Sequence, residues 1–300
     1  MSYAGCLRVI TYLILSFPLF LQAQTFGLAP SNKEAMPVKY YQVQDRYEYG
    51  ARLLALALSK SKEPFVMEAP ATQNMNEARG NLEVISGRLD VQWLSTTTER
   101  EEKMLSVKVP IYRGVLGLRL LLANQEKRDV LKNIRSIEGL RVFVGGHGLH
   151  WGDLPIYAAN KLKVATHVKY KQLFEMLINN RFDYFHRGVN EIWGELERYK
   201  GRLSIVEDVM LFYPHPVYFF VSKQRPELAF QLEKGLEFAL EDGSFQKLFL
   251  EMHGVFIEKA ALKARRLIVL KNPVLPANTP SLDTSWWLPE KFAPTLEANP

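Results

Sequence analysis

Hydrophobic and polar residues alternate along most of the chain in patterns that predict strands and helices in turn. Leu89, Val91 and Trp93 are separated by polar residues, as expected of a half-buried strand. Residues 115–123 form an apolar run that predicts another strand, and the segment 170–178 has apolar residues at helical spacing. Strands that alternate with helices in two regions of the chain indicate an α/β fold with two lobes.

The same patterns place the other elements. Further strands are expected at 38–43, 65–67, 140–144, 164–165, from 183 onward, and at 217–221. Helices are expected from 45, over 75–86, after 100, and over 151–161, 226–240 and 245–252. The glycine-rich segment 145–148 is interpreted as a loop, and the charged segment 124–129 as a boundary between lobes. The proline-rich residues beyond 271 predict an extended surface tail, with Trp286 and Trp287 as its anchor.

The first residues have the pattern of a secretory signal peptide. Arg8 precedes the apolar run 9–21, and Ala23 offers a small residue at the cleavage point. The run is short for a membrane span and contains Pro18, so cleavage and export to the periplasm are expected rather than anchoring. The single cysteine, Cys6, lies in this segment, so the mature chain would have neither a disulfide nor a thiolate metal site.

Charge and motifs narrow the function. The net charge is +6, but basic residues are mixed with acidic ones, and the densest cluster, 263–266, is typical of a solvated helix face rather than of a nucleic-acid reader. Gly-x-Ser-x-Gly, His-Glu-x-x-His and a cysteine nucleophile in the mature chain are all missing, so no enzyme and no cofactor are predicted. His147, His150 and Asp153 lack a third well-spaced His or Glu, so no metal is expected.

The hydroxyl-rich string 95–100 (Ser-Thr-Thr-Thr-Glu-Arg) follows the strand that ends near Trp93. Thr96 and Glu99 match a capping box, and a helix start alone would explain them. The alternative is an anion site, since a helix N-terminus presents free N–H groups. Arg100 favours this alternative, because a cation in the first turn is unfavourable unless it meets a carboxylate.

Two later segments carry further candidates. The glycines at 145–148 precede a helix and could cradle an anion, although they match neither a Walker loop nor a Rossmann fingerprint. Arg187 and Glu191 follow a predicted strand, where open α/β sheets place ligand sites. An i,i+4 helix pair between them is an equally good explanation. Trp93, Trp151, Tyr184 and Trp193 are candidates for the walls of a cleft.

The segment 170–191, a helix, a turn and a strand with a polar end, resembles the bacterial extracellular solute-binding proteins of family 3, the polar amino acid-binding type. The resemblance extends over residues 38–256, and the Ser/Thr-rich string ending in Glu-Arg is its most specific element. It implies a type II periplasmic binding protein fold, with two α/β lobes joined by two crossing segments. The implied organisation is given in residue ranges: signal peptide 1–23, lobe 1 from 24–120 and 221–275, lobe 2 from 121–220, and C-terminal tail 276–300.

By this resemblance, Ser95 and Arg100 would hold the α-carboxylate of a ligand, and the loop at 145–148 would lend backbone N–H groups. Trp151 departs from the small residues of the family. Arg187 stands where many relatives have an acid that binds the ligand's ammonium group. The expected ligand-binding residues are Ser95, Thr96, Arg100, Gly146, His147, Gly148, Trp151, Arg187 and Glu191.

The resemblance therefore implies a periplasmic solute-binding protein that captures a small polar or anionic, amino acid-like ligand by hinge closure. Its partners would be that ligand and an ABC permease or a membrane sensor, without nucleic acid, and a monomer is expected. The alternatives are a periplasmic dehydratase on the same fold, with His147 or Glu191 as general acid, and an interaction module without a small ligand.

Overall fold

The computed structural model describes residues 34–42, 45–61, 63–69, 75–280 and 287 of the 300. Residues from Glu34 onward form one compact unit. The predicted signal peptide and Trp286 lie outside the described residues. Among the helices that the structure describes, none is both long and apolar enough to cross a membrane.

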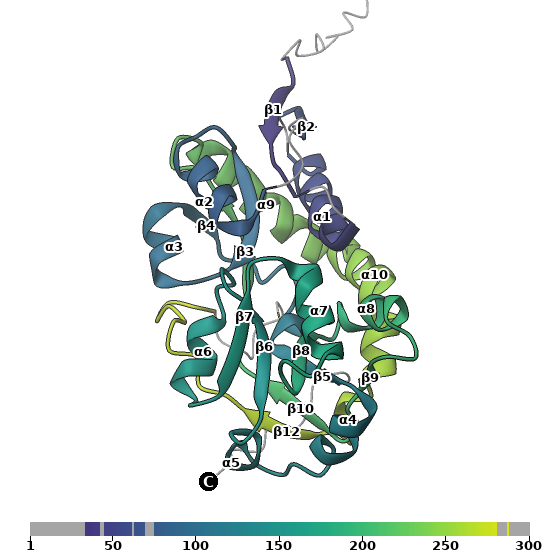
Figure 1. The fold of residues 1–300 in the computed structure, drawn as a ribbon. Coiled ribbons are helices and arrows are strands. Elements are labelled where there is room, and N and C mark those ends of the chain that lie inside the picture. Colours follow the sequence, from purple (N-terminus) through teal and green to yellow (C-terminus); the bar gives the residue numbers. More distant parts are fainter. Residues whose placement is uncertain (1–33, 43–44, 62, 70–74, 281–286, 288–300) are drawn as a thin grey trace, which may run out of the picture. The chain divides into compact units, whose positions relative to one another are not determined.

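A three-stranded antiparallel sheet combines segments that are distant in the sequence (Figure 1). Its central strand, β11 (Val217–Val221), pairs with β3 (Val91–Ser95) and with β4 (Leu105–Val107). All residues of β11 are buried, as its apolar sequence predicts. The elements around this sheet are the parallel pair β1 (Met36–Lys39) and β2 (Phe65–Glu68), the 3-10 turn η1 (Asp45–Tyr47), and the helices α1 (Glu48–Ser59), α2 (Glu77–Ile85), α3 (Thr98–Lys103) and α9 (Pro226–Glu241).

A seven-stranded mixed sheet forms the second core, with the order β12-β10-β5-β8-β6-β7 and with β9 paired to β5. Its strands are β5 (Leu118–Ala123), β6 (Val144–Gly148), β7 (Lys163–His167), β8 (Tyr184–Gly188), β9 (Ser204–Ile205), β10 (Val209–Phe212) and β12 (Arg266–Val269). The remaining elements are α4 (Gln125–Leu131), α5 (Ile137–Leu140), α6 (Leu154–Ala159), α7 (Tyr170–Ile178), α8 (Ile192–Arg198) and α10 (Ser244–Ala260), with the 3-10 turns η2 (Val115–Gly117) and η3 (Leu262–Ala264). β6 runs parallel to β7 and β8, whereas β5 runs antiparallel to β8 and β10.

Helices α1 and α9 pack at a close approach that only glycine permits. A Cβ atom on Gly235 would lie 2.1 Å from the carbonyl oxygen of Ala57, far inside van der Waals contact. Leu53 and Leu54 of α1 and Leu232 of α9 belong to the same buried cluster. The contact fixes α1 and therefore the turn η1 that precedes it.

The α/β prediction is confirmed, but several local predictions are wrong. The segment 145–148 is not a loop: it belongs to β6, because its glycines allow neighbouring rings to approach the strand. Residues 115–117 form a 3-10 turn rather than strand. The charged segment 124–129 is mostly helix α4, and its place as a boundary between lobes stays a prediction. The basic cluster 263–266 is not a helix face, since it leads through η3 into β12.

The lobe boundaries remain a prediction. One observation bears on them, because β12 comes from the segment that the prediction gives to lobe 1 and pairs in parallel with β10. In the tail, the predicted anchor is confirmed for Trp287, which is buried, contacts Gly114 and accepts a hydrogen bond of 2.8 Å from Arg113 through its carbonyl oxygen.

Candidate functional site

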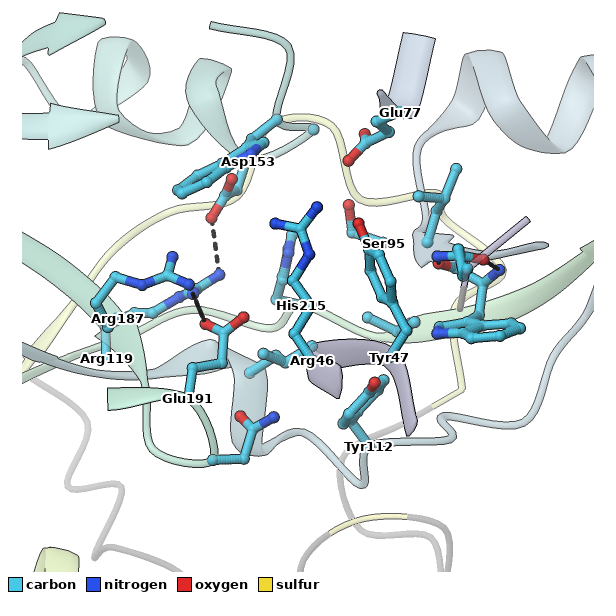
Figure 2. A pocket seen from close by; sticks show the side chains of 18 residues that line it. Arg46, Tyr47, Glu77, Ser95, Tyr112, Arg119, Asp153, Arg187, Glu191 and His215 are labelled. Carbon is cyan, nitrogen blue, oxygen red and sulfur yellow. Dashed lines mark hydrogen bonds and ion pairs between the residues drawn. The ribbon is translucent and has the colours of Figure 1, made fainter. Parts of the chain in front are cut away.

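A cavity of about 140 Å³ lies where residues of the two larger sheets meet (Figure 2). We call it the polar cavity. β3 and β11 supply one part of its wall, and β5, the end of β8 and the loop after β6 supply another. Its lining residues are Gln42, Arg46, Tyr47, Glu77, Trp93, Leu94, Ser95, Tyr112, Leu116, Arg119, Trp151, Gly152, Asp153, Arg187, Asn190, Glu191, His215 and Val217.

Asp153 is the centre of a buried polar network at the wall of the cavity. Its carboxylate accepts hydrogen bonds from Arg119 at 2.8 Å and from the Tyr213 hydroxyl at 2.7 Å, and its other oxygen lies 3.1 Å from Nε2 of His147. Burial alone would raise the pKa of Asp153, but His147 and Arg119 outweigh it and hold that pKa well below the usual range. Asp153 is therefore ionised at neutral pH, and its carboxylate orients the guanidinium of Arg119.

Arg187, at the end of β8, is held by two carboxylates. Its guanidinium makes three contacts of 2.8–2.9 Å with Glu195 and one of 3.1 Å with Glu191. It also lies 5.0 Å from the ring centre of Trp151 and 5.5 Å from that of Tyr170. Glu191 is the accessible member, with 28% of its side chain exposed against 5% for Glu195. The predicted i,i+4 pair therefore exists, but it joins a strand end to the start of α8 rather than two turns of a helix.

Arg100 lies behind the cavity wall and is already paired. It donates to the carbonyl oxygen of Ser95 at 2.6 Å and to its hydroxyl at 3.0 Å, and it forms an ion pair with Glu77. Gly152 is packed against this group, since a Cβ there would lie 2.6 Å from the guanidinium. Burial raises the pKa of Glu77 even though Arg100 acts in the opposite direction. A carboxylate from a ligand would therefore compete with Glu77 for Arg100.

The predicted ligand-binding residues divide into two groups. Four of them line the polar cavity: Ser95, Trp151, Arg187 and Glu191. The others lie behind its wall: Thr96, Arg100, Gly146, His147 and Gly148. Their roles in binding remain predictions.

Packing contacts explain why most residues of the second group do not line the cavity. His147 is fully buried against Asp153, and Gly146 and Gly148 lie under the rings of Phe182 and Trp151, with no room for a Cβ. Thr96 donates to Glu101 at 2.7 Å. The predicted capping box is displaced by one residue, because Thr97 rather than Thr96 caps α3, accepting from the Arg100 N–H at 3.2 Å.

The sequence interpretation missed several charged residues of the cavity. Arg119 interrupts the apolar run of β5, and a lone cation in a strand that is otherwise buried needs a partner, so it was a usable signal. Asp153 was considered only as a metal ligand. Arg46 and Glu77 are ordinary surface residues by pattern, and only the fold brings them to the site. Across the described part of the chain, no cluster of three or more His, Cys, Asp or Glu side chains is arranged to hold a metal ion.

His215 provides a test of the electrostatics. Burial lowers its pKa from 6.5 to about 4, so the folded protein keeps the imidazole neutral. The unfolded chain takes up this proton near pH 6.5, so stability is complete above that pH and is lost as the pH falls toward 4. Between pH 7 and pH 4.5 the wild type is expected to lose on the order of 2 kcal/mol more unfolding free energy than His215→Gln, because glutamine takes up no proton. Urea unfolding of both proteins at pH 7 and pH 4.5 measures it. An equal loss in the two proteins would contradict a neutral buried His215.

Comparison with known proteins concerns structure rather than sequence. No protein-family model matches the sequence, and no curated protein sequence matches it. An ancestral arginine-binding protein bound to arginine is similar, with a TM-score of 0.53, 18% identity, and 73% of this chain and 97% of that chain covered. A structure from glutathione import in Streptococcus mutans has a TM-score of 0.56 and 13% identity, with 74% and 96% covered. An ancestral amino acid-binding protein, a precursor of cyclohexadienyl dehydratase, has a TM-score of 0.53 and 14% identity, with 73% and 95% covered.

At these sequence identities the structural similarity establishes the fold. The ligand has to be inferred from the residues that line the cavity. The structural alignments cover 95–97% of these three similar proteins, so this chain matches their whole fold. The chain therefore has the α/β fold of the substrate-binding proteins of amino acid ABC transporters.

Proposed function

We propose that this chain is an extracytoplasmic solute-binding protein that captures a small amino acid-like ligand in the polar cavity. The observation that carries the proposal is the balance of charges in the lining. Its cations and its carboxylates are equal in number: Arg46, Arg119, Arg187, Glu77, Asp153 and Glu191. A zwitterion matches such a lining, because each end finds a group of opposite charge and neither charge is desolvated without a partner.

The availability of these groups suggests how such a ligand would lie. Asp153 is used by Arg119 and Tyr213, whereas Glu191 is partly exposed and sits 3.7 Å from Arg119, beyond normal hydrogen-bond length. Oε2 of Glu191 is held by Arg187 at 3.1 Å and by the Gly188 N–H at 3.1 Å, which leaves Oε1, within the described chain, as the carboxylate oxygen open to an ammonium group. Arg46 is exposed, and among the described residues no carboxylate lies within ion-pair distance of it. We assign the ligand's carboxylate to Arg46 and the Ser95 hydroxyl, with Arg100 behind Ser95.

The finer organisation forms part of the proposal. The lobes, 24–120 with 221–275 and 121–220, would close on the ligand, and Trp151 and Arg187 would complete the cavity from the second lobe. Closure is favoured because only the closed form contacts the ligand from both sides. We also propose export through residues 1–23 to the periplasm, a monomeric state, and an ABC permease or membrane sensor as partner.

A thermal-shift screen of residues 24–300 against the common amino acids and small organic acids tests the function. A ligand at one hundred times its dissociation constant stabilises the folded protein by about 2.7 kcal/mol, which corresponds to a rise of a few degrees in the unfolding temperature.

Glu191→Gln is expected to weaken amino acid binding at least tenfold, because an amide loses the charge that meets the ammonium group. It should leave binding of ligands without an amine nearly unchanged.

Calorimetric titrations of the wild type and of Glu191→Gln with the same ligands give the two sets of affinities. Glu197→Gln is the control, since Glu197 is an exposed residue of α8 outside the cavity. If Glu191→Gln bound amino acids as tightly as the wild type, Glu191 would not be the ammonium site. If no compound of the screen shifted the unfolding temperature, the amino acid-binding function itself would be wrong.

A dehydratase is the second candidate, favoured by one observation. His215 lines the cavity as a neutral imidazole beside Asp153 and Arg119, and a neutral imidazole can exchange protons with a bound acid. The test is chemical: a ligand that is recovered intact after incubation identifies a binding protein, whereas a ligand that is consumed identifies an enzyme.

A further inference from the structure

A second cavity lies beside the polar cavity and is larger, at about 230 Å³. We call it the aromatic cavity. Residues common to both cavities form the boundary between them: Arg46, Tyr112, Arg187, Asn190 and Glu191. The rest of its lining comes from α1, α7, α8 and α10: Tyr49, Tyr170, Gly194, Glu195, Arg198, Met252, His253 and Phe256. A ligand that touched the boundary residues would therefore reach both spaces.

Rings make up much of the wall of the aromatic cavity. The ring centres of Tyr49 and Tyr112 lie 5.1 Å apart, and His253 lies 4.5 Å from Tyr49 and 5.8 Å from Tyr112. Met252 adds a polarizable thioether, which makes favourable contacts with aromatic rings. Such a lining offers edges and faces to a flat apolar group, and tilted ring pairs at these distances stabilise beyond area burial alone.

Three buried polar atoms in this region have no hydrogen-bond partner among the described residues. His253 is 6% exposed, and within the described chain neither of its ring nitrogens makes a hydrogen bond of normal geometry. Asn190, on the boundary, has a buried side-chain oxygen that also lacks a hydrogen-bond partner among the described residues. A buried polar group left unpaired is costly, so each is a candidate to bond a ligand.

The two arginines of the boundary, Arg46 and Arg187, both lie near the ring of Tyr170. Arg187 is 5.5 Å and Arg46 is 5.3 Å from the ring centre of Tyr170. Glu195 is occupied by Arg187, so the carboxylate contributes no free charge to the aromatic cavity. Most charged groups thus gather at the boundary. Beyond it Arg198, an exposed residue at the end of α8, adds one cation, and a cation is compatible with the face of an uncharged ring.

We propose that the ligand has two parts: an α-amino acid head in the polar cavity and an aromatic ring in the aromatic cavity, as in an aromatic amino acid or a dipeptide ending in one. The inference rests on the proposed function and names its ligand class. Size supports it, because an apolar cavity of about 150 Å³ binds one benzene molecule. The aromatic cavity exceeds this volume, whereas the polar cavity, at about 140 Å³, has room for little more than the head.

Gly194 offers a direct way to close the aromatic cavity. It lines that cavity from α8, and a Cβ added there would meet nothing within 4 Å, so a larger side chain extends into open space without a clash. Replacing a helical glycine also favours the helix by up to about 1 kcal/mol. Gly194→Leu should therefore block the cavity in a folded protein, and Gly194→Ala is the matched control with the same backbone effect and little added volume.

The experiment measures calorimetric affinities for two pairs of probes: L-phenylalanine with L-alanine, and L-alanyl-L-phenylalanine with L-alanyl-L-alanine. In at least one pair, the wild type and Gly194→Ala should bind the aromatic member at least tenfold more tightly than its partner. Gly194→Leu should reduce the aromatic member to the affinity of its alanine counterpart and leave that counterpart unchanged.

Three results would overturn the inference: equal affinity within both pairs, an aromatic preference that survives in Gly194→Leu, and no binding of any probe. Its failure is separable from failure of the proposed function. If the broader screen yields an amino acid ligand that depends on Glu191, the binding function stands and only the aromatic assignment falls. If that screen yields none, both fall.

Discussion

Asp153→Ala is expected to lower the free energy of unfolding by about 3–5 kcal/mol, because it leaves the buried Arg119 guanidinium without its charge partner. Only 5% of the Arg119 side chain and 4% of the Asp153 side chain are exposed. Tyr213 would also lose the acceptor of its 2.7 Å hydrogen bond. Urea unfolding at pH 7, followed by circular dichroism, measures the change.

The double variant Arg119→Met with Asp153→Leu distinguishes a missing partner from a general loss of packing. It removes both charges, and replacing a buried ion pair by apolar residues of similar size is often neutral or stabilising. The double variant should therefore be more stable than Asp153→Ala. If it were less stable than Asp153→Ala, the network would contribute through packing or through Tyr213 and His147 rather than through the ion pair.

Gly235→Ala is expected to destabilise the protein by about 2 kcal/mol, within the range of about 1–3 kcal/mol that an extra carbon in a well-packed core usually costs. The new Cβ would lie 2.1 Å from the Ala57 carbonyl oxygen and 2.8 Å from its carbon, and both are backbone atoms that move only with α1. Because η1 with Arg46 and Tyr47 directly precedes α1, a displaced helix should also weaken ligand binding.

The matched control is Gly194→Ala, at a helical glycine whose added Cβ meets no atom within 4 Å. That change is expected to be neutral or to stabilise by up to about 1 kcal/mol, since glycine is a poor helix former. The two unfolding curves are compared under the same conditions. Equal effects of the two substitutions would mean that α1 and α9 tolerate an extra carbon, and that the close approach does not limit stability.

Many of the main strands and helices could be predicted from the sequence because they depend on local periodicity, whereas β4, β9, β10, β12, α4 and α8 were not, and the strand expected at 140–144 begins only at Val144. Alternation over 89–93 and helical spacing over 170–178 correspond to β3 and α7, although the predicted half-burial of β3 is wrong, because its polar residue Gln92 is buried too. The segment 145–148 could not be predicted in this way. Glycine is common in loops, but at Gly146 it makes room for the Phe182 ring against a buried strand, and that contact spans 36 residues of sequence.

The candidate site was accessible to sequence reasoning only in part. Ser95 and Arg187 lie at the ends of strands, and Trp151 and Glu191 follow strands shortly after their ends. The carboxyl ends of strands are where α/β folds place ligands, so the position of these residues near a cavity was predictable. No pattern, however, indicates that Arg100 is already paired with Glu77, 23 residues away. Such a pairing depends on the distance between two side chains after folding.

By itself, then, the sequence of this protein determined its class of secondary structure, its alternation of strands and helices, and a set of polar strand ends. These features follow from the preferences of neighbouring residues and from which positions must be buried. The tertiary structure alone decided which charges meet: Arg119 with Asp153 and Arg187 with Glu195, beside a cavity that is also lined by Arg46 from the distant turn η1. Ion pairs and cavities are set by distances between segments far apart in sequence, and hydrophobic periodicity carries no information about those distances.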